Sequence, residues 1–123
     1  MKAVPDRGDV ILLSFDPTLG HEQAGFRPAL VLSPALYNKA SGLCLICPIT
    51  TKIKGYPFEV ALDGAKKTSG VALADQVRSI DWQARKVKVT DRISATAFLI
   101  ISGQASASWA RSISYSEHNG DQQ

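Results

Sequence analysis

The fold is decided by residues 7–51, which read RGDVILLSFDPTLGHEQAGFRPALVLSPALYNKASGLCLICPITT. This stretch contains three apolar runs of strand length, at residues 10–15, 29–32 and 43–49. Each run stops at a cluster of Pro, Gly or Asn, the residue types that favour turns over regular structure. The stretch therefore predicts three short strands joined by polar loops, with a turn or short helix over residues 35–42.

Further strand-like segments follow along the chain. Residues 57–62 and 75–80 alternate apolar and polar side chains, a pattern typical of half-exposed strands. Apolar segments at residues 70–74 and 87–89 predict two more short strands. Five to seven short strands with few helices, in a chain of 123 residues, predict a mainly β protein built on a strongly bent sheet or a small barrel.

Composition indicates one globular domain. Hydrophobic residues make up 45% of the chain and charged residues 20%, so a single core is expected and global disorder is not. No apolar run approaches the length of a bilayer span, and the N-terminal residues lack the apolar segment of a secretory signal. We therefore expect a cytoplasmic protein that does not bind membranes. The net charge of +3 suits a polyanionic partner without identifying one.

The two cysteines, Cys44 and Cys47, have the C-x-x-C spacing that binds zinc or supports redox chemistry in other settings. Here both lie in LCLICPI, an apolar segment that predicts a strand. An odd spacing on a strand directs two side chains to opposite faces. A zinc site also needs two further ligands, and the only histidines are His21 and His118. We therefore expect neither a redox pair nor a metal site, and no cofactor.

Several segments together resemble one known family. GDV, FDPTLGHEQAGFRPALVLSP, CPITTKIKGYPFEV and GVALADQVRSIDW occur in the order and near the spacing typical of the MazF/PemK family of toxin endoribonucleases from bacterial toxin–antitoxin pairs. Agreement of several segments at once is far more specific than any one of them. The resemblance implies a small SH3-like or CcdB-like β-barrel with a C-terminal helix, and a homodimer. It also implies single-stranded RNA as the substrate and an acidic, MazE-like antitoxin as a protein partner.

The C-terminal part of the chain resembles the family less closely. We expect the barrel core over residues 1–93, a helix over residues 94–110 capped by Ser94, and a flexible tail over residues 111–123. Within the helix, the apolar residues 98–101 cannot all face one core, so part of this run is expected at a subunit contact.

RNA can be cleaved without a protein nucleophile or a metal, because its own 2′-hydroxyl can attack the neighbouring phosphorus. The enzyme then has to accept and donate a proton and stabilise the added negative charge of the transition state. The resemblance implies Arg27 and Thr50 as the catalytic pair, with the guanidinium forking two hydrogen bonds onto phosphate oxygens. Arginine stays protonated, so we assign the base to Glu22, with His21 as a weaker candidate. The expected RNA contacts are Gln23, Lys52, Lys54, Asp75, Gln76 and Arg78.

Two other functions stay open on the sequence. A non-catalytic toxin of the CcdB type would bind DNA gyrase, and its toxicity would persist without Arg27. An inactive RNA-binding or regulatory dimer is the second alternative, because the C-terminal sequence departs from the charged amphipathic helix usual in the family. Cutting of a long single-stranded RNA in EDTA, as opposed to binding without cutting, separates a nuclease from a binder.

Overall fold

Seven short strands and two helices make up the part of the chain that the structure describes. The computed structural model describes residues 3–14 and 25–120. In chain order the elements are β1 (Asp9–Ser14), β2 (Phe26–Val31), α1 (Ala35–Ser41), β3 (Leu43–Thr50), β4 (Glu59–Ala61), β5 (Val71–Leu73), β6 (Arg78–Asp81), β7 (Lys88–Arg92) and α2 (Ala95–Gly120). Each strand predicted from the sequence is present, with ends that differ by up to three residues.

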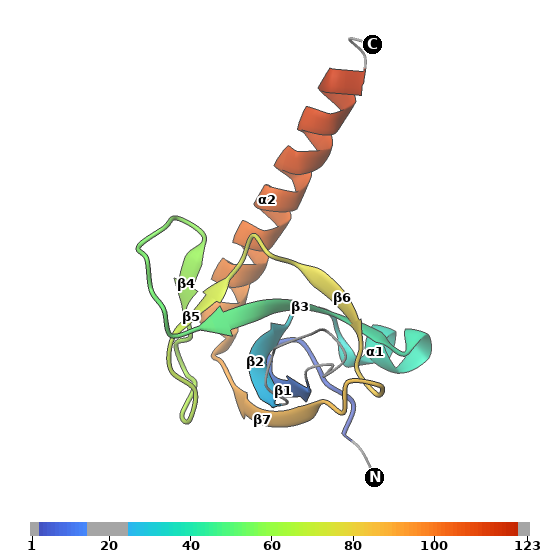
Figure 1. The fold of residues 1–123 in the computed structure, drawn as a ribbon, viewed down its shortest axis with the longest axis vertical. Coiled ribbons are helices and arrows are strands. Elements are labelled where there is room, and N and C mark those ends of the chain that lie inside the picture. The colour runs from blue at the N-terminus through green and yellow to red at the C-terminus, as the bar shows by residue number, and fades with distance from the viewer. Residues whose placement is uncertain (1–2, 15–24, 121–123) are drawn as a thin grey trace.

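All seven strands belong to one strongly bent antiparallel sheet (Figure 1). The strand order is β4-β5-β3-β2-β1-β7, and β6 pairs with β3. The first half of β3 pairs with β6 and its last two residues pair with β5, so β3 carries the sheet around the bend. Over the described residues the sheet is barrel-like without closing completely, which confirms the predicted mainly β, barrel-type fold.

Side chains alternate between the two faces of the sheet and form two separate cores. The helix-side core packs against α2 and includes Val10, Leu30, Cys47, Ile49 and Ile101. The far-side core lies on the other face and consists of Ile11, Ala29, Val31, Cys44, Ile46, Ile80 and Trp82.

The two cysteines belong to different cores, as their spacing predicted. Cys44 lies in the far-side core and Cys47 in the helix-side core, and both are free thiols. Burial raises the pKa of Cys44 to about 11 and that of Cys47 to about 12. Both thiols therefore stay protonated at neutral pH, where a thiolate is needed for redox chemistry or metal binding.

Asn38 of α1 connects three parts of the chain at the edge of the far-side core. Its side-chain nitrogen donates hydrogen bonds to the carbonyl oxygens of Pro5 at 2.7 Å and Ser33 at 3.0 Å, while its Oδ1 accepts one from the Ser33 hydroxyl at 2.6 Å. The indole N–H of Trp82 donates to the Asn38 carbonyl at 2.8 Å. Because Asn38 is fully buried, these bonds satisfy a polar group that would otherwise be costly, and they fix Trp82 in place.

The C-terminal helix is longer than the sequence predicted. It ends at Gly120 instead of near residue 110, so residues 111–120 continue the helical backbone. Gly103 weakens a helix by about 1 kcal/mol relative to alanine, and the frequent alanines around it offset that cost. The C-terminal half of α2 extends away from the sheet (Figure 1).

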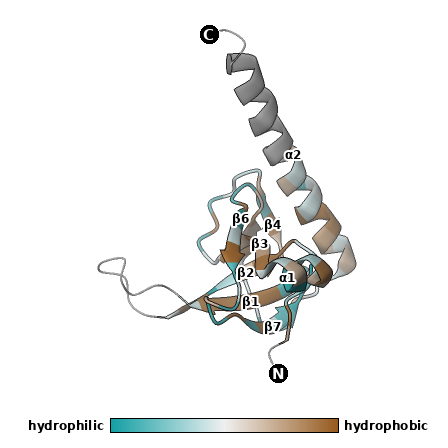
Figure 2. Ribbon diagram, turned by 90° about the vertical axis from the view of Figure 1, so that its right-hand side faces the viewer, coloured by the Kyte–Doolittle hydropathy of each residue, from teal (hydrophilic) through white to brown (hydrophobic). Residues whose placement is uncertain are grey.

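The apolar run in the first turns of α2 divides between core and surface, as expected. Ile101 is fully buried and Phe98 is half-buried, whereas Leu99 and Ile100 are 70% and 49% exposed. Figure 2 shows that hydrophobic residues concentrate along the strands and in these first turns. Within residues 3–14 and 25–120, no helix is both long enough and apolar enough to cross a lipid bilayer.

Candidate active site

Two prolines lie where the pairing of β2 with β3 ends. The ladder stops at the pair Ala29↔Pro48, and neither Pro28 nor Pro48 has an N–H group to donate to it. Both strands continue beyond this point, β2 along β1 and β3 along β5. The next side chain on the same face as Ala29 is Arg27 of β2, and the next on the same face as Pro48 is Thr50 of β3. The two side chains therefore flank the place where the strands stop pairing.

A groove of about 530 Å³ includes both of these side chains in its lining. Its floor is apolar and is formed in part by Ala29, Ile46 and Ile80 of the far-side core. Its polar lining residues are Arg27, Thr50, Gln76, Arg78 and Arg85. Among the described residues the lining thus contains three arginines and no carboxylate, an arrangement that attracts a polyanion.

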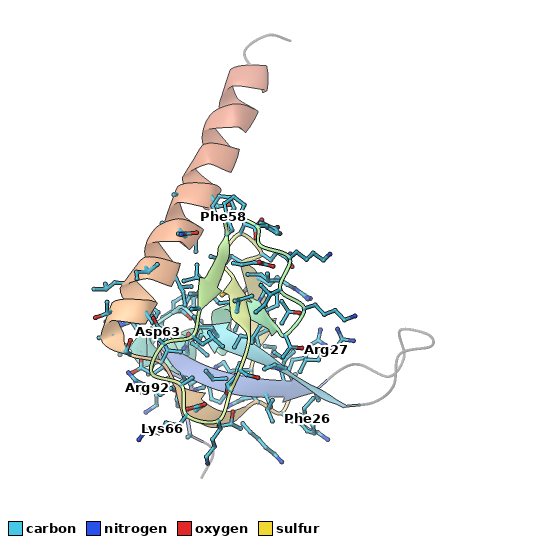
Figure 3. The ribbon with its side chains drawn as sticks, turned by 90° about the vertical axis from the view of Figure 1, so that its left-hand side faces the viewer. Phe26, Arg27, Phe58, Asp63, Lys66 and Arg92 are labelled. Carbon is cyan, nitrogen blue, oxygen red and sulfur yellow. The ribbon has the colours of Figure 1, made fainter. Side chains whose placement is uncertain are left out.

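Arg27 faces this groove because side chains alternate along β2. Figure 3 shows Phe26 and Arg27 on opposite sides of the strand. Leu13 of β1 pairs with Arg27 and also lines the groove. On the other side, the Nζ atom of Lys88 lies 5.3 Å from the centre of the Phe26 ring. The guanidinium of Arg27 is carried by a strand instead of a loop, which limits how far it can move.

The hydroxyl of Thr50 is oriented by a local hydrogen bond. Thr50 is the last residue of β3, one residue beyond the strand that the sequence predicted, and its Oγ1 accepts the backbone N–H of Lys52 at 3.0 Å. A threonine hydroxyl has one proton to donate. Since this bond uses the oxygen as an acceptor, the proton stays available for an acceptor in the groove, such as a phosphate oxygen.

Gln76 reaches the groove from the turn after β5, and Arg78 reaches it from the start of β6. The backbone N–H of Gln76 donates to the Leu73 carbonyl at 3.0 Å, which forms the turn. Arg78 is the first residue of β6 and pairs with Ile46 in β3. The structure thus brings four of the predicted site residues to one groove, two at the ends of β2 and β3, one on the turn after β5 and one at the start of β6.

Arg85 also lines the groove, although it was not among the RNA contacts expected from the sequence. It belongs to the turn between β6 and β7, where its N–H donates to the Asp81 carbonyl and its carbonyl accepts the N–H of Ser14 at 2.9 Å. The next residue, Lys86, has a φ of 53°, which is uncommon for a residue other than glycine. Turn geometry of this kind has no reliable signal in the sequence QARKVK.

Lys52 and Lys54 lie in the loop between β3 and β4 and are absent from the groove lining. The carboxylate of Glu59 organises this loop by accepting the N–H groups of Lys54, Gly55 and Tyr56 at 3.0, 2.7 and 3.1 Å. These bonds, led by that from Lys54, hold the pKa of Glu59 below its usual range. The RNA contacts expected from the two lysines stay predictions.

Asp75 is also absent from the groove lining, although it precedes Gln76. Its Oδ2 accepts a hydrogen bond from the Tyr56 hydroxyl at 2.9 Å, and this bond is the main reason that the pKa of Tyr56 is raised. Asp75 therefore connects the β3–β4 loop to the turn that carries Gln76. His21, Glu22 and Gln23 lie outside the described residues, so the predicted base and one predicted RNA contact stay predictions.

The groove combines groups that bind phosphate and stabilise negative charge on it. Arginine side chains donate paired hydrogen bonds to phosphate oxygens, and Thr50 adds a hydroxyl donor. In the part of the chain that the structure describes, no group of three or more His, Cys, Asp or Glu side chains could hold a metal ion.

Comparison with known proteins gives a consistent result. Residues 6–105 match the family model described as PemK-like, MazF-like toxin of type II toxin–antitoxin system. The endoribonuclease toxin MazF of Escherichia coli K12 is 63% identical over 82 residues, covering 67% of this chain and 73% of that protein. Endoribonuclease PemK of Escherichia coli is 38% identical over 109 residues, covering 85% of this chain and 82% of that protein.

Solved structures agree with the sequence comparison. A crystal structure of MazE-MazF from Deinococcus radiodurans superimposes with a TM-score of 0.80 at 46% identity, covering 86% of this chain and 96% of that one. The family match spans the strands that build the groove, including Arg27, Thr50, Gln76 and Arg78. The chain therefore belongs to the PemK-like, MazF-like family of toxins of type II toxin–antitoxin systems.

Proposed function

We propose that this chain is the toxin of a toxin–antitoxin pair and a sequence-specific endoribonuclease that cuts single-stranded mRNA. The observation that carries the proposal is the groove in which Arg27 and Thr50 lie with two further arginines, Arg78 and Arg85. Relatives named MazF, PemK and ChpB are endoribonucleases, which supports the same reaction class.

In the proposed reaction the nucleophile comes from the RNA. The 2′-oxygen loses its proton to a base and bonds to the adjacent phosphorus, the bond from phosphorus to the 5′-oxygen breaks, and the 5′-oxygen takes up a proton. The products are a 2′,3′-cyclic phosphate and a 5′-hydroxyl. Arg27 and Thr50 stabilise the added charge on the phosphoryl oxygens, and Glu22 is the proposed base. No step uses a metal ion.

The substrate is proposed to be single-stranded because the 2′-oxygen, the phosphorus and the leaving oxygen must come into line. A-form duplex geometry holds the backbone away from that alignment, and bases are read most readily when they are unpaired. Arg78, Arg85 and Gln76 line the groove beside Arg27, where they are suited to hold the flanking nucleotides. Lys52 and Lys54, on the loop that follows Thr50, extend the positive surface along the proposed path of the RNA.

The test is incubation of the purified protein with a long single-stranded RNA in EDTA. We expect discrete fragments that carry 5′-hydroxyl and 2′,3′-cyclic phosphate ends. Arg27→Ala should abolish these fragments, while Arg7→Ala, a change at an exposed arginine outside the groove, should not. Intact RNA that still shifts on a gel would identify a binder instead of a nuclease. Fragments with 5′-phosphate ends would refute the proposed chemistry.

The role of Glu22 has its own test. If Glu22 is the base, Glu22→Gln should lower kcat strongly and remove the acidic limb of the pH–rate profile, because the amide cannot accept the proton. Near-normal cleavage by Glu22→Gln, together with loss of cleavage in Arg27→Ala and Thr50→Ala, would place the base elsewhere.

The proposed protein partners are an acidic antitoxin and a second copy of the chain. An acidic segment suits a groove that holds three arginines, and solved relatives include MazE-MazF complexes. The exposed Leu99 and Ile100 of α2 support a homodimer contact. Competition between an acidic antitoxin peptide and RNA, and the mass in solution of Ile100→Asp against wild type, test these two partners. Because the proposed substrate is mRNA, the proposed location is the cytoplasm.

A further inference from the structure

Gly70 lies directly against the backbone of Thr50. Its φ is +111°, a conformation that side-chain-bearing residues rarely adopt. A Cβ atom added to Gly70 would be 2.3 Å from the Thr50 carbonyl oxygen, 2.9 Å from its carbonyl carbon and 3.3 Å from the nitrogen of Thr51. The neighbouring atoms are all backbone, so a rotamer change cannot relieve the collision. Only glycine fits at this position without moving Thr50.

This contact matters because, at Thr50, β3 pairs with β5 and no longer with β2. The pairing of β3 with β2 has already ended at Pro48, whereas Thr50 still pairs with Val71 of β5. The residue just before Val71 is Gly70. The position of the Thr50 hydroxyl in the groove therefore depends on how closely the start of β5 approaches the end of β3.

The loop that leads to Gly70 is fastened to β7. The carboxylate of Asp91 accepts the backbone N–H groups of Lys66, Lys67 and Thr68 at 3.1, 2.7 and 2.8 Å. Figure 3 shows this loop, marked by Asp63 and Lys66, passing beside the strand on which Arg92 is labelled. Asp91 thereby limits movement of the segment that ends at Gly70.

We propose that Gly70 is a positioning residue for Thr50, and that Asp91 serves the same purpose by holding the loop before it. This inference rests on the proposed nuclease function, because it assigns the placement of the Thr50 hydroxyl to residues that do not touch RNA. The lining of the groove includes neither Gly70 nor Asp91.

The experiment compares Gly70→Ala with a matched control, Gly64→Ala. Gly64 has a φ of +92° and its added Cβ would lie 2.5 Å from the backbone nitrogen of Ser94, so alanine there strains the same loop in a similar way. Gly64, however, contacts the start of α2 instead of Thr50. Both variants should be less stable than wild type, and only Gly70→Ala should lose activity beyond its loss of folded protein.

The size of the effect follows from the collision. Moving a Cβ from 2.3 Å to an ordinary contact of at least 3.4 Å requires the backbones at Gly70 and Thr50 to separate by about 1 Å, and we expect Thr50 to take up most of that shift because Asp91 fastens the loop before Gly70. A displacement of that size at a reacting group costs on the order of 100-fold in rate. We expect kcat to fall by about 100-fold with little change in KM for a single-stranded RNA, because the arginines proposed to bind the RNA stay in place.

A double-mutant cycle with Thr50→Val separates positioning from general damage. If Gly70 acts through the hydroxyl, adding Gly70→Ala to Thr50→Val should cause little further loss. Losses that multiply, or a kcat equal to that of Gly64→Ala, would overturn the inference. If Gly70→Ala yields no folded protein, the test is made with Asp91→Asn instead. A several-fold lower kcat in this variant, with no further loss when it is combined with Thr50→Val, supports the inference. An unchanged kcat in Asp91→Asn overturns the inference.

The same cycle distinguishes failure of the positioning role from failure of the nuclease proposal. RNA left intact by the wild-type protein would remove the nuclease proposal and the inference with it, whereas full cleavage by Thr50→Val would remove the catalytic role of Thr50 and the inference while leaving the nuclease intact. Strong loss in Thr50→Val with normal kcat in Gly70→Ala would overturn the positioning role alone and leave the nuclease intact.

Discussion

Replacing Thr50 with valine removes one hydroxyl while keeping the size and branching of the side chain. Folding should hardly be affected, because the bond that Thr50 Oγ1 accepts comes from the exposed N–H of Lys52, which water can satisfy instead. Valine also suits a strand position as well as threonine does. We therefore expect the free energy of unfolding to change by no more than about 0.5 kcal/mol.

Catalysis by the same variant should fall sharply. Removing one preorganised donor from a developing oxyanion typically lowers kcat by about 100- to 1,000-fold, which corresponds to about 3–4 kcal/mol of transition-state stabilisation. KM should stay within a few-fold of the wild-type value, since Arg27, Arg78 and Arg85 still bind the RNA. Thr50→Ser keeps the donor and is the control, with kcat expected near that of the wild type.

The assay is cleavage of an RNA that contains one mapped site, measured in single turnover at saturating enzyme for the rate constant and with varied RNA concentration for KM. Thermal unfolding of the three proteins, followed by circular dichroism, provides the matching measure of stability. A valine variant with kcat within about threefold of wild type would refute the assigned donor role. A variant that raises KM at unchanged kcat would show that the hydroxyl binds the substrate and the transition state equally.

Five other substitutions have expected outcomes. Arg85→Ala should weaken RNA binding and reduce the slope of log affinity against log salt by about 0.7, as expected for one phosphate contact on a single strand, measured by fluorescence anisotropy. Lys86→Gly should raise stability by up to about 1 kcal/mol in urea unfolding, because Lys86 adopts a φ of 53° that favours glycine. Ile101→Ala should cost about 2–5 kcal/mol, since Ile101 is fully buried, while Leu36→Ala, at an exposed side chain outside the proposed subunit contact, should stay within about 0.5 kcal/mol. Although partial burial raises the pKa of Asp91, the N–H groups of Lys66, Lys67 and Arg92 hold it well below the ordinary 3.8. A depressed pKa stabilises the fold above pH 3.8 and loses that effect as the pH falls further, so the difference in Tm between wild type and Asp91→Asn should be greatest at neutral pH and shrink in acid.

The strands could be predicted from the sequence because their apolar runs and turn residues agree, but the start of β2 could not. Proline usually ends a strand, so Pro28 suggested that the strand began at Ala29, whereas β2 begins at Phe26. Pro28 is tolerated because β2 pairs with β1 alone beyond Ala29, so the missing N–H falls where the ladder to β3 has ended. The consequence is functional, since Arg27 lies within a strand and not in the preceding loop.

The residues that line the groove could be predicted only in part from the sequence. The expectation that Arg27 and Thr50 act together came from the resemblance to the MazF/PemK family, because side-chain alternation alone does not fix which strands pair or in which register. Arg85 reaches the groove through a turn whose shape depends on the unusual φ of Lys86 and on the bond from Ser14, a contact between residues distant in sequence. The requirement for glycine at position 70 could not be predicted from the neighbouring sequence either, because it arises from the close approach of the β3 backbone at Thr50.

Strand register is what joins the fold to the site. The face of β2 that carries Arg27 also carries Ala29 of the far-side core, and the face of β3 that carries Thr50 also carries Ile46. A slip of one residue along β2 would turn Arg27 away from the groove, toward the exposed face where Phe26 lies beside Lys88, and would turn Leu30 out of the helix-side core. Burial of apolar residues on both faces of the sheet therefore opposes such a slip. The packing that stabilises the protein is thus also what keeps the guanidinium and the hydroxyl in one groove.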